Sequence, residues 1–233
     1  MGFWKAARRL ALAGLACVAY GTFVESKLYQ VRRVKLPVLP PKSEPIRLLH
    51  ISDAHLLDRD RRAVEFIKSL AGLEPDIVVA TGDMISEAES IPVLADALGR
   101  LLEKPGVFTL GSSDYLKPRA VNPFKYLRER GQRRLLQADL PTGELVAALE
   151  AGGWVNVEGK DTVLDVCGVK LEFRGTGDAH IGLDDYPKVA GKRKRGAKLL
   201  IGVTHAPYRR VLDAMTADGV ELILTGLTHG GQV

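Results

Sequence analysis

The chain has 233 residues, of which 46% are hydrophobic, and this length and composition favour one domain with a single sizeable core. Its formal net charge is +5, but residues 1–35 hold seven bases and one acid, which leaves 26 bases against 27 acids in the remainder. A nearly neutral globular part disfavours a nucleic-acid partner, whereas basic residues around an apolar segment are typical of membrane association.

Residues 1–28 form the first predicted segment, an apolar signal or membrane anchor. The run from Leu10 to Val24 consists mainly of Leu, Ala and Val. Three bases precede this run: Lys5, Arg8 and Arg9. The pattern is typical of an export signal, and a retained anchor is the alternative, because the aromatic residues Trp4 and Tyr29 suit the membrane interface. A helix packed on the domain is the third interpretation. Bases on both sides of the run leave the membrane orientation open.

Residues 29–45 are predicted to be a stiff, proline-rich connector that leads into the first strand. Four prolines lie within nine residues: Pro37, Pro40, Pro41 and Pro45. The folded domain is predicted to span residues 46–233.

Within this domain, short apolar runs alternate with helical patterns. The first predicted elements are strands at Ile46–Ile51, Asp76–Ala80 and Gly106–Leu110, with helices between them at about Arg59–Ala71 and Ile91–Leu102. Two strands are then expected in Asp161–Arg174 around a turn at Cys167-Gly168, and strands at Lys198–Val203 and Val220–Leu224 flank a helix whose first turn contains Pro207. The alternation predicts βαβ units in a layered α/β fold with a largely buried sheet.

Side chains of metal-ligating type come shortly after the predicted strands: Asp53, His55, Asp83, Asp114, His205 and His229. Because sites in open α/β sheets lie beyond the carboxyl ends of the strands, we expect these side chains to converge in one crevice. Each alone has a plainer interpretation, as a helix cap or as a satisfied polar residue. Glycines beside them allow close approach of the backbone to a metal and a phosphate: Gly82, Gly111, Gly226, Gly230 and Gly231.

The motifs around these residues resemble those of the calcineurin-like metallophosphoesterases, in particular the membrane-associated phosphodiesterase branch. Asp53-Ala54-His55 resembles D-x-H, and Gly82-Asp83 resembles G-D. Gly111-Ser112-Ser113-Asp114 resembles G-N-H-D/E, His205 resembles an isolated histidine, and residues 226–232 resemble G-H-T-H-G-G-Q. The resemblance implies an α/β/β/α sandwich and metal-dependent hydrolysis of phosphate esters.

In that family two divalent metals lie close together. The resemblance implies that Asp53, His55 and His229 hold the first metal, that Asp83 bridges both metals, and that His205 belongs to the second. Ser112 and Leu227 replace the other two ligands of the second metal, an asparagine and a histidine. Because leucine cannot ligate and a serine hydroxyl is a poor ligand, we expect the second site to be weak or empty. The mixture of carboxylates and imidazoles favours manganese, iron or zinc.

Ser113 and Asp114 are the predicted catalytic residues. Ser113 stands where the family has a histidine that stabilises the transition state or protonates the leaving group. Asp178 and His180 are the predicted substrate-binding residues, and His180 is a candidate replacement for that histidine. The alternative interpretation is that Asp178 and His180 form a structural turn.

The leading hypothesis is a membrane-associated hydrolase of phosphodiesters, phosphomonoesters or pyrophosphates with an impaired second metal site. The alternative is a catalytically silent relative that binds metal or phosphate. The expected substrate is a phosphate ester that is lipid-linked or derived from the cell envelope, and the N-terminal segment is expected to contact a membrane. No nucleic-acid partner is expected, and the chain is predicted to be a monomer. The chain stops at Val233, one residue after the G-G-Q, so we expect the last strands of the sandwich to be lacking.

Overall fold

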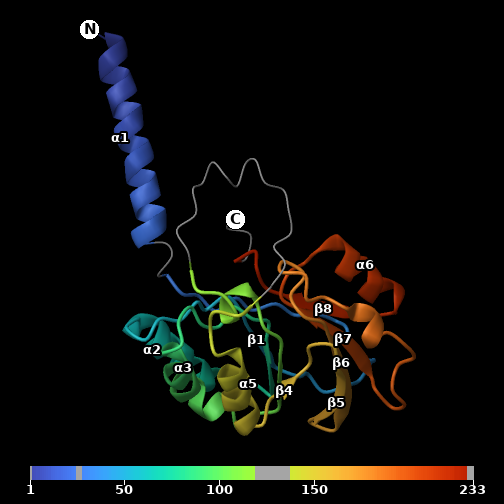
Figure 1. The fold of residues 1–233 in the computed structure, drawn as a ribbon. Coiled ribbons are helices and arrows are strands. Elements are labelled where there is room, and N and C mark those ends of the chain that lie inside the picture. Colours follow the sequence, from blue (N-terminus) through green and yellow to red (C-terminus); the bar gives the residue numbers. More distant parts are fainter. Residues whose placement is uncertain (1, 25–27, 119–136, 230–233) are drawn as a thin grey trace. The chain divides into compact units, whose positions relative to one another are not determined.

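The computed structural model describes residues 2–24, 28–118 and 137–229, and it divides the chain into two units, Met1–Leu36 and Pro37–Val233. The first unit contains α1 (Gly2–Phe23), a helix of 22 residues (Figure 1). Its apolar side chains are exposed, including Leu10, Leu15 and Val18. Among the residues that the structure describes, no helix combines the length and the apolar character that a membrane crossing requires.

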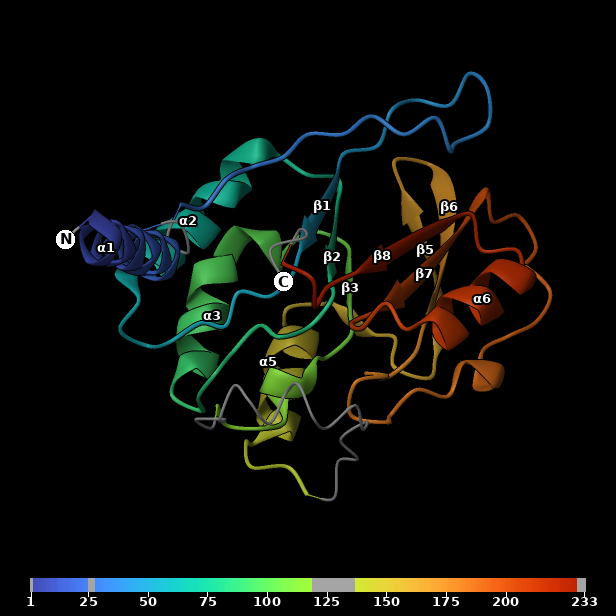
Figure 2. The same cartoon turned by 90° about the horizontal axis from the view of Figure 1, so that it is seen from above.

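The second unit contains two sheets and the helices that cover them (Figure 2). Its helices are α2 (Arg61–Ser69), α3 (Ser90–Leu98), α5 (Thr142–Ala151) and α6 (Arg209–Ala217). Short 3₁₀ helices span Leu70–Leu73, Gly99–Leu101, Ser112–Asp114 and Tyr186–Lys188. The strands are β1 (Leu48–Ile51), β2 (Ile77–Ala80), β3 (Gly106–Phe108), β4 (Val155–Asn156), β5 (Asp161–Val166), β6 (Val169–Gly175), β7 (Leu199–Thr204) and β8 (Leu222–Thr225).

Each sheet has four strands. The first has the order β1-β2-β3-β4 and is parallel throughout, with Leu48 opposite Ile77 and Val78 opposite Gly106. The second has the order β5-β6-β7-β8, in which β5 and β6 form an antiparallel hairpin and the other pairs are parallel. Parallel neighbours place their carboxyl ends at the same edge, so the loops after β6, β7 and β8 are brought together.

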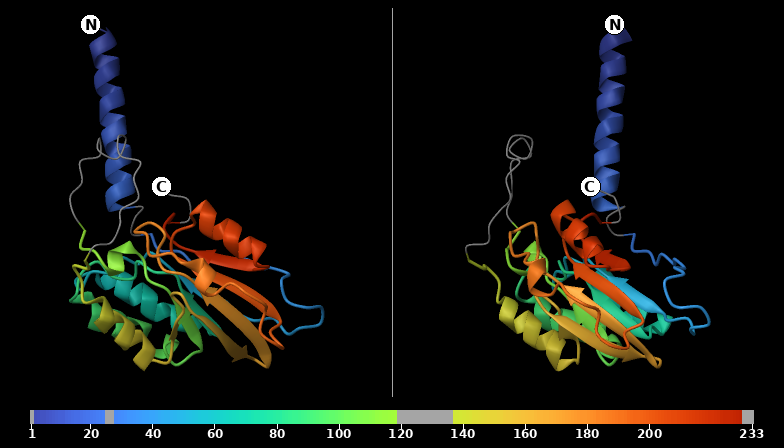
Figure 3. Two further views of the ribbon diagram at one scale, coloured as in Figure 1. Left: turned by 45° about the vertical axis from the view of Figure 1, so that its right-hand side comes forward. Right: turned by 90° about the vertical axis from the view of Figure 1, so that its right-hand side faces the viewer.

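Alternation along β2 shows how the layers are built. All four of its residues are buried, because both faces of the sheet are covered. Val78 and Ala80 belong to a core formed with α2, α3 and α5, whereas Ile77 and Val79 face the second sheet and pack in a core with Phe173 and Ile201. On the far side of the second sheet, α6 contributes a third, smaller core. The order of layers is therefore helix, sheet, sheet, helix (Figure 3), which confirms the predicted α/β/β/α sandwich.

Three details differ from the sequence-based expectation. The compact unit begins at Pro37, before the expected boundary at residue 46, because Val38 and Leu39 pack against the core between the sheets. The prediction that Pro207 lies in the first turn of a helix was wrong, since Tyr208 is still extended and α6 begins one residue later. Finally, α5 and the two-residue strand β4 were not predicted; β4 is too short to show an alternating pattern.

Candidate metal centre

The predicted ligand residues lie in loops at the carboxyl ends of strands from both sheets. Asp53 and His55 follow β1, Asp83 follows β2, His205 follows β7 and His229 follows β8. The chain after β8 comes to lie beside the end of β1 (Figure 2), where the Leu227 amide donates a hydrogen bond of 2.9 Å to Asp53 Oδ1. The loops of the two sheets therefore meet at one edge of the sandwich.

The five side chains, each of which follows a strand, gather into one cluster. Asp53, His55 and His229 form one trio whose ligand atoms lie within 4.8 Å of one another, and Asp53, Asp83 and His205 form a second. Asp83 Oδ2 lies 3.5 Å from His55 Nε2 and 3.4 Å from His205 Nε2, so this oxygen stands between two imidazoles. We call these five residues the ligand cluster.

The backbone at the ligand cluster is strained. Asp53, His55, Asp83, Leu227 and His229 have positive φ values between 42° and 68°, and they are five of the eight non-glycine residues with positive φ in the described part. A residue with a Cβ adopts this conformation only where its surroundings enforce it, and such strain concentrates at functional sites. The strain therefore supports a functional role for this edge of the sandwich.

His205 has the environment of a metal ligand. Its Nδ1 lies 2.7 Å from the carbonyl oxygen of Thr81, which can only accept, so Nδ1 carries the proton and Nε2 points away from that bond. Nε2 is fully buried and has no hydrogen-bond partner within the described residues. Burial lowers the pKa of His205, but the carboxylates of Asp83 and Asp178 outweigh it and raise the pKa to about 9. A divalent cation between Nε2 and Asp83 would take the place of the proton held there, so the donors fit a metal.

The pKa values of His55 and Asp83 are shifted in the direction that ligation needs. Burial lowers the pKa of His55, which keeps its imidazole neutral. Burial raises the pKa of Asp83, but its contacts with His205 and His55 outweigh this and hold the pKa below its usual range, so Asp83 is a carboxylate. The rings of His55 and His229 stack in parallel with their centroids 5.2 Å apart.

Three of the glycines singled out in the sequence permit close approach. A Cβ on Gly111 would lie 2.3 Å from Asp83 Oδ1 and 2.7 Å from the His205 ring. A Cβ on Gly226 would lie 3.0 Å from His205 Nδ1, and Gly82, with φ +91°, leaves no room for a Cβ against Gly111. Gly230 and Gly231 lie outside the described residues.

The turn after β3 holds Asp83 in place. The Ser113 amide donates to Asp83 Oδ1 over 2.7 Å and its hydroxyl lies 3.1 Å from Oδ2. Asp114, the other predicted catalytic residue, is fully buried and accepts hydrogen bonds from the backbone amides of Met84, Ile85 and Gly111. Burial and the charge of Asp83 raise the pKa of Asp114 to about 7. Asp114 thus ties the loops after β2 and β3 together, and Ser112 begins the same turn, half-buried.

Glu158 is a residue that sequence reasoning missed. Its carboxylate accepts hydrogen bonds from the Tyr115 hydroxyl at 3.0 Å and from the Leu110 amide at 3.3 Å, on either side of the turn that carries Ser113. Burial raises the pKa of Glu158. Glu158 follows β4, and because that strand was not predicted, its position at the end of a strand gave no signal.

Asp178 and His180 lie in the loop after β6. Asp178 is fully buried, and its Oδ1 accepts the His180 amide over 2.8 Å, which closes a turn. Its Oδ2 has no hydrogen-bond partner in the described part, and burial raises the pKa of Asp178. The His180 ring is half-buried, with Nδ1 3.2 Å from the Tyr208 hydroxyl. Asp178 therefore supports the loop from within, whereas His180 lies nearer its surface.

Leu227 lies at the position where the motif resemblance implies a histidine ligand. Its amide binds Asp53, and its side chain packs against the apolar cluster under α6, which includes Ala179 and Ala206. The leucine therefore completes a small core and supplies no ligand atom.

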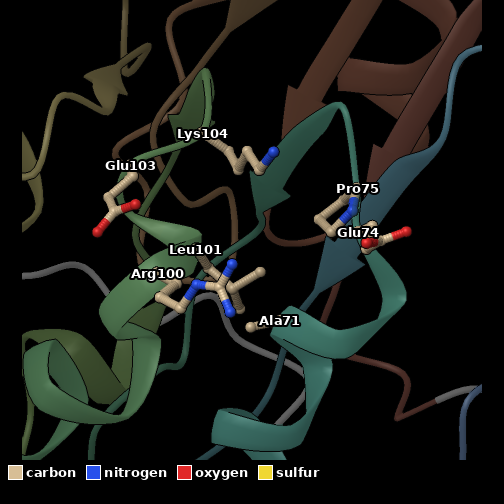
Figure 4. Close-up of a pocket in the computed structure, with 7 residues that line it drawn as sticks. All are labelled: Ala71, Glu74, Pro75, Arg100, Leu101, Glu103 and Lys104. Atoms are coloured by element: carbon tan, nitrogen blue, oxygen red, sulfur yellow. The ribbon is translucent and has the colours of Figure 1, made fainter.

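A cavity of about 160 Å³ lies elsewhere on the second unit (Figure 4). Its lining residues are Ala71, Glu74, Pro75, Arg100, Leu101, Glu103 and Lys104. They precede β2 and β3, so they lie at the opposite ends of these strands from the ligand cluster and take no part in it.

Known proteins resemble the chain in sequence and in structure. The family model of calcineurin-like phosphoesterases matches residues 46–230. A bovine (Bos taurus) transmembrane protein with a metallophosphoesterase domain is 27% identical over 87% of this chain and 45% of its own length. The Bacillus subtilis metallophosphoesterase YkoQ is 25% identical over 83% of this chain and 64% of its own length, so the chain spans less than two thirds of either relative. The phosphopantetheinyl hydrolase of Mycobacterium tuberculosis, a solved structure, is 13% identical with a TM-score of 0.47 and covers 78% of this chain and 83% of its own.

Proposed function

Because the chain belongs to the calcineurin-like phosphoesterase family, we propose that it is a metal-dependent hydrolase of phosphate esters whose catalytic centre is the ligand cluster. The observation that carries the proposal is the position of Asp83 Oδ2, within 3.5 Å of the Nε2 atoms of both His55 and His205. Carboxylate and imidazole donors arranged in this way are suited to first-row divalent metals. A metal bound here supplies an activated water and neutralises charge on the phosphate oxygens.

The residues divide unequally between two metal positions. Asp53, His55 and His229 would hold the first metal together with Asp83, whose Oδ2 faces His55. The motif resemblance assigns Asp83 and His205 to the second metal, and Asp53 is a third candidate ligand because its ligand atom lies within 4.8 Å of theirs. Beside His205, the second position still lacks a second imidazole, because Leu227 supplies no ligand atom and its side chain packs into the α6 core. We therefore propose one tight and one weak site, filled by manganese, iron or zinc.

Metal titration tests this division. One equivalent of Mn²⁺ should bind tightly to the full chain, and a second should bind only at large excess. Asp53→Asn should abolish the tight event, whereas Asp213→Asn, at an exposed carboxylate that pairs with Arg209, should leave it intact. Two equally tight equivalents would contradict the asymmetry.

Hydrolysis of p-nitrophenyl phosphate and bis(p-nitrophenyl) phosphate tests the activity. We expect turnover that a chelator removes and added Mn²⁺, Fe²⁺ or Zn²⁺ restores, with little left in Asp53→Asn. The choice between the two substrates separates monoesterase from diesterase action. Tight metal binding without turnover would overturn the proposal in favour of the catalytically silent alternative.

We further propose that the N-terminal helix brings the chain to a membrane and that the substrate is lipid-linked or derived from the envelope. Leu10, Leu12, Leu15 and Val18 are exposed on α1, and the positively charged bases of its first half suit anionic headgroups. The name of the bovine relative also supports a membrane location. The full chain should co-sediment with vesicles containing phosphatidylglycerol, and the double substitution Leu12→Glu with Leu15→Glu should abolish this. Equal sedimentation of both proteins would refute the role of α1.

A further inference from the structure

The loop that carries His180 borders the ligand cluster. Strands β6 and β7 are parallel neighbours with Gly175 opposite Val203, so the loops after them emerge side by side. Ala179 and Ala206, which flank His180 and His205 in sequence, are both fully buried in the apolar cluster that also contacts Leu227. His180 therefore lies in the loop next to that of His205 and beside the apolar cluster that the Leu227 side chain contacts.

Among the histidines in the loops at this edge of the sandwich, His180 is the one outside the ligand cluster. His55, His205 and His229 belong to that cluster, and His50, within β1, bonds to the Thr81 hydroxyl over 2.7 Å. The Ser113 hydroxyl is held by Asp83. Cleavage of a phosphate ester needs a proton at the leaving oxygen, and a half-buried imidazole is the side chain best suited to supply it near neutral pH.

Side chains from the start of α6 hold the His180 ring. The Tyr208 hydroxyl lies 3.2 Å from His180 Nδ1, so Nε2 is the nitrogen available to a substrate. The Arg210 guanidinium stands 4.9 Å over the Tyr208 ring. It is itself locked by two hydrogen bonds to Asp184, of 2.7 and 2.8 Å, and by one to the carbonyl of Ala179. Arg210, in α6, thus holds residues on both sides of His180, namely Ala179 and Asp184.

We propose that His180 donates the proton to the leaving oxygen and that Tyr208 and Arg210 are the positioning residues that aim its ring. The inference rests on the proposed hydrolase function. In the step, a water oxygen bonds to phosphorus and loses a proton to solvent while the phosphorus–oxygen bond to the leaving group breaks. The leaving oxygen keeps the electron pair and takes the proton from Nε2, and the half-exposed imidazole regains a proton from solvent. Asp178, which accepts the His180 amide, supports the loop.

The leaving group supplies the test. Nitrophenolate departs without a proton, whereas phenolate is a stronger base and needs one. His180→Ala should therefore slow hydrolysis of a phenyl ester by at least about a hundredfold and hardly change hydrolysis of the matching p-nitrophenyl ester. The His180→Ala variant should bind as much tightly held Mn²⁺ as the unmodified chain does. This result would show that the variant is folded and that His180 is not a ligand.

The positioning residues have their own variants. Tyr208→Phe removes only the hydroxyl, and we expect a loss of about tenfold in kcat for the phenyl ester, the worth of one hydrogen bond, with KM unchanged. Arg210→Gln should act in the same direction, and Arg209→Gln, its exposed neighbour that pairs only with Asp213 among the described residues, is the matched control. The ¹⁵N shifts of the His180 ring in metal-free protein give a readout apart from activity: Tyr208→Phe should move them and Arg209→Gln should not.

Three outcomes would overturn the inference. Equal effects of His180→Ala on both esters would show that His180 does not protonate the leaving group, and loss of tight Mn²⁺ would make it a ligand. Unmoved ¹⁵N shifts in Tyr208→Phe would remove Tyr208 from its positioning role. If the unmodified, metal-loaded chain hydrolyses neither ester, the proposed function fails, and this assignment fails with it.

Discussion

Gly111→Ala is the substitution whose consequence the geometry defines most sharply. The φ of Gly111 is −112°, which any residue adopts, so the effect of the methyl group is purely steric. The new Cβ would lie 2.3 Å from Asp83 Oδ1 and 2.7 Å from His205 Nδ1, against about 3.4 Å for an ordinary contact. Both ligand residues must therefore move, Asp83 by about 1 Å and His205 by about 0.7 Å.

These shifts exceed what a metal site tolerates, because ligand distances must hold to within about 0.2 Å. We expect the affinity for the first equivalent of Mn²⁺ to fall by about 10- to 100-fold, the size of effect seen when a ligand loses its support. Overpacking should cost roughly 1–3 kcal/mol of unfolding free energy. The loss should be lessened by about 0.4–1 kcal/mol, because alanine has less freedom than glycine in the unfolded chain.

Isothermal titration with Mn²⁺ and urea unfolding in the presence of a chelator measure the two effects separately. Gly143→Ala is the matched control: Gly143 lies in α5 with no heavy atom within 4 Å of an added Cβ. That variant should gain about 0.5–1 kcal/mol and keep its Mn²⁺ affinity. An unchanged Mn²⁺ affinity in Gly111→Ala would refute the reasoning, since it would mean that Asp83 and His205 are not the ligands that Gly111 accommodates.

Three further predictions concern stability. Arg174→Met leaves the fully buried Glu172 carboxylate without its guanidinium partner and should lower the unfolding free energy, measured in urea, by about 3–5 kcal/mol. Arg209→Met, at an exposed site, should change it little, and a loss below about 1 kcal/mol for Arg174→Met would count against a buried ion pair. Gly202→Ala places a Cβ 2.7 Å from Met215 Sδ and should lower the unfolding free energy by roughly 1–3 kcal/mol. The double variant with Met215→Ala should lose less than the sum of the two single losses, and strict additivity would argue against that contact. Mn²⁺ at about 100 times its dissociation constant should raise the unfolding free energy by about 2.7 kcal/mol, a gain that Asp53→Ala removes; an equal gain in that variant would place the metal elsewhere.

The layered fold and the convergence of the ligand cluster were predictable from the amino-acid sequence alone. Both follow from local patterns: the buried runs of β2 and β7 predict strands covered on two faces, and Asp83 and His205 each follow such a run. Because strand direction is repeated from one βαβ unit to the next, the position of a residue after its strand is enough to place it at the common edge.

The contacts that hold the ligand cluster and its neighbouring loops in place were not predictable from the sequence. The bonds of Glu158 to Tyr115 and of Tyr208 to His180 join residues 43 and 28 positions apart, and no periodic pattern records such pairings. Leu227 is another example: the motif resemblance implies a missing ligand at this position, whereas packing under α6 shows which contacts the leucine makes. Contacts of this kind depend on how separate loops dock, which is set by the three cores together and by no single segment.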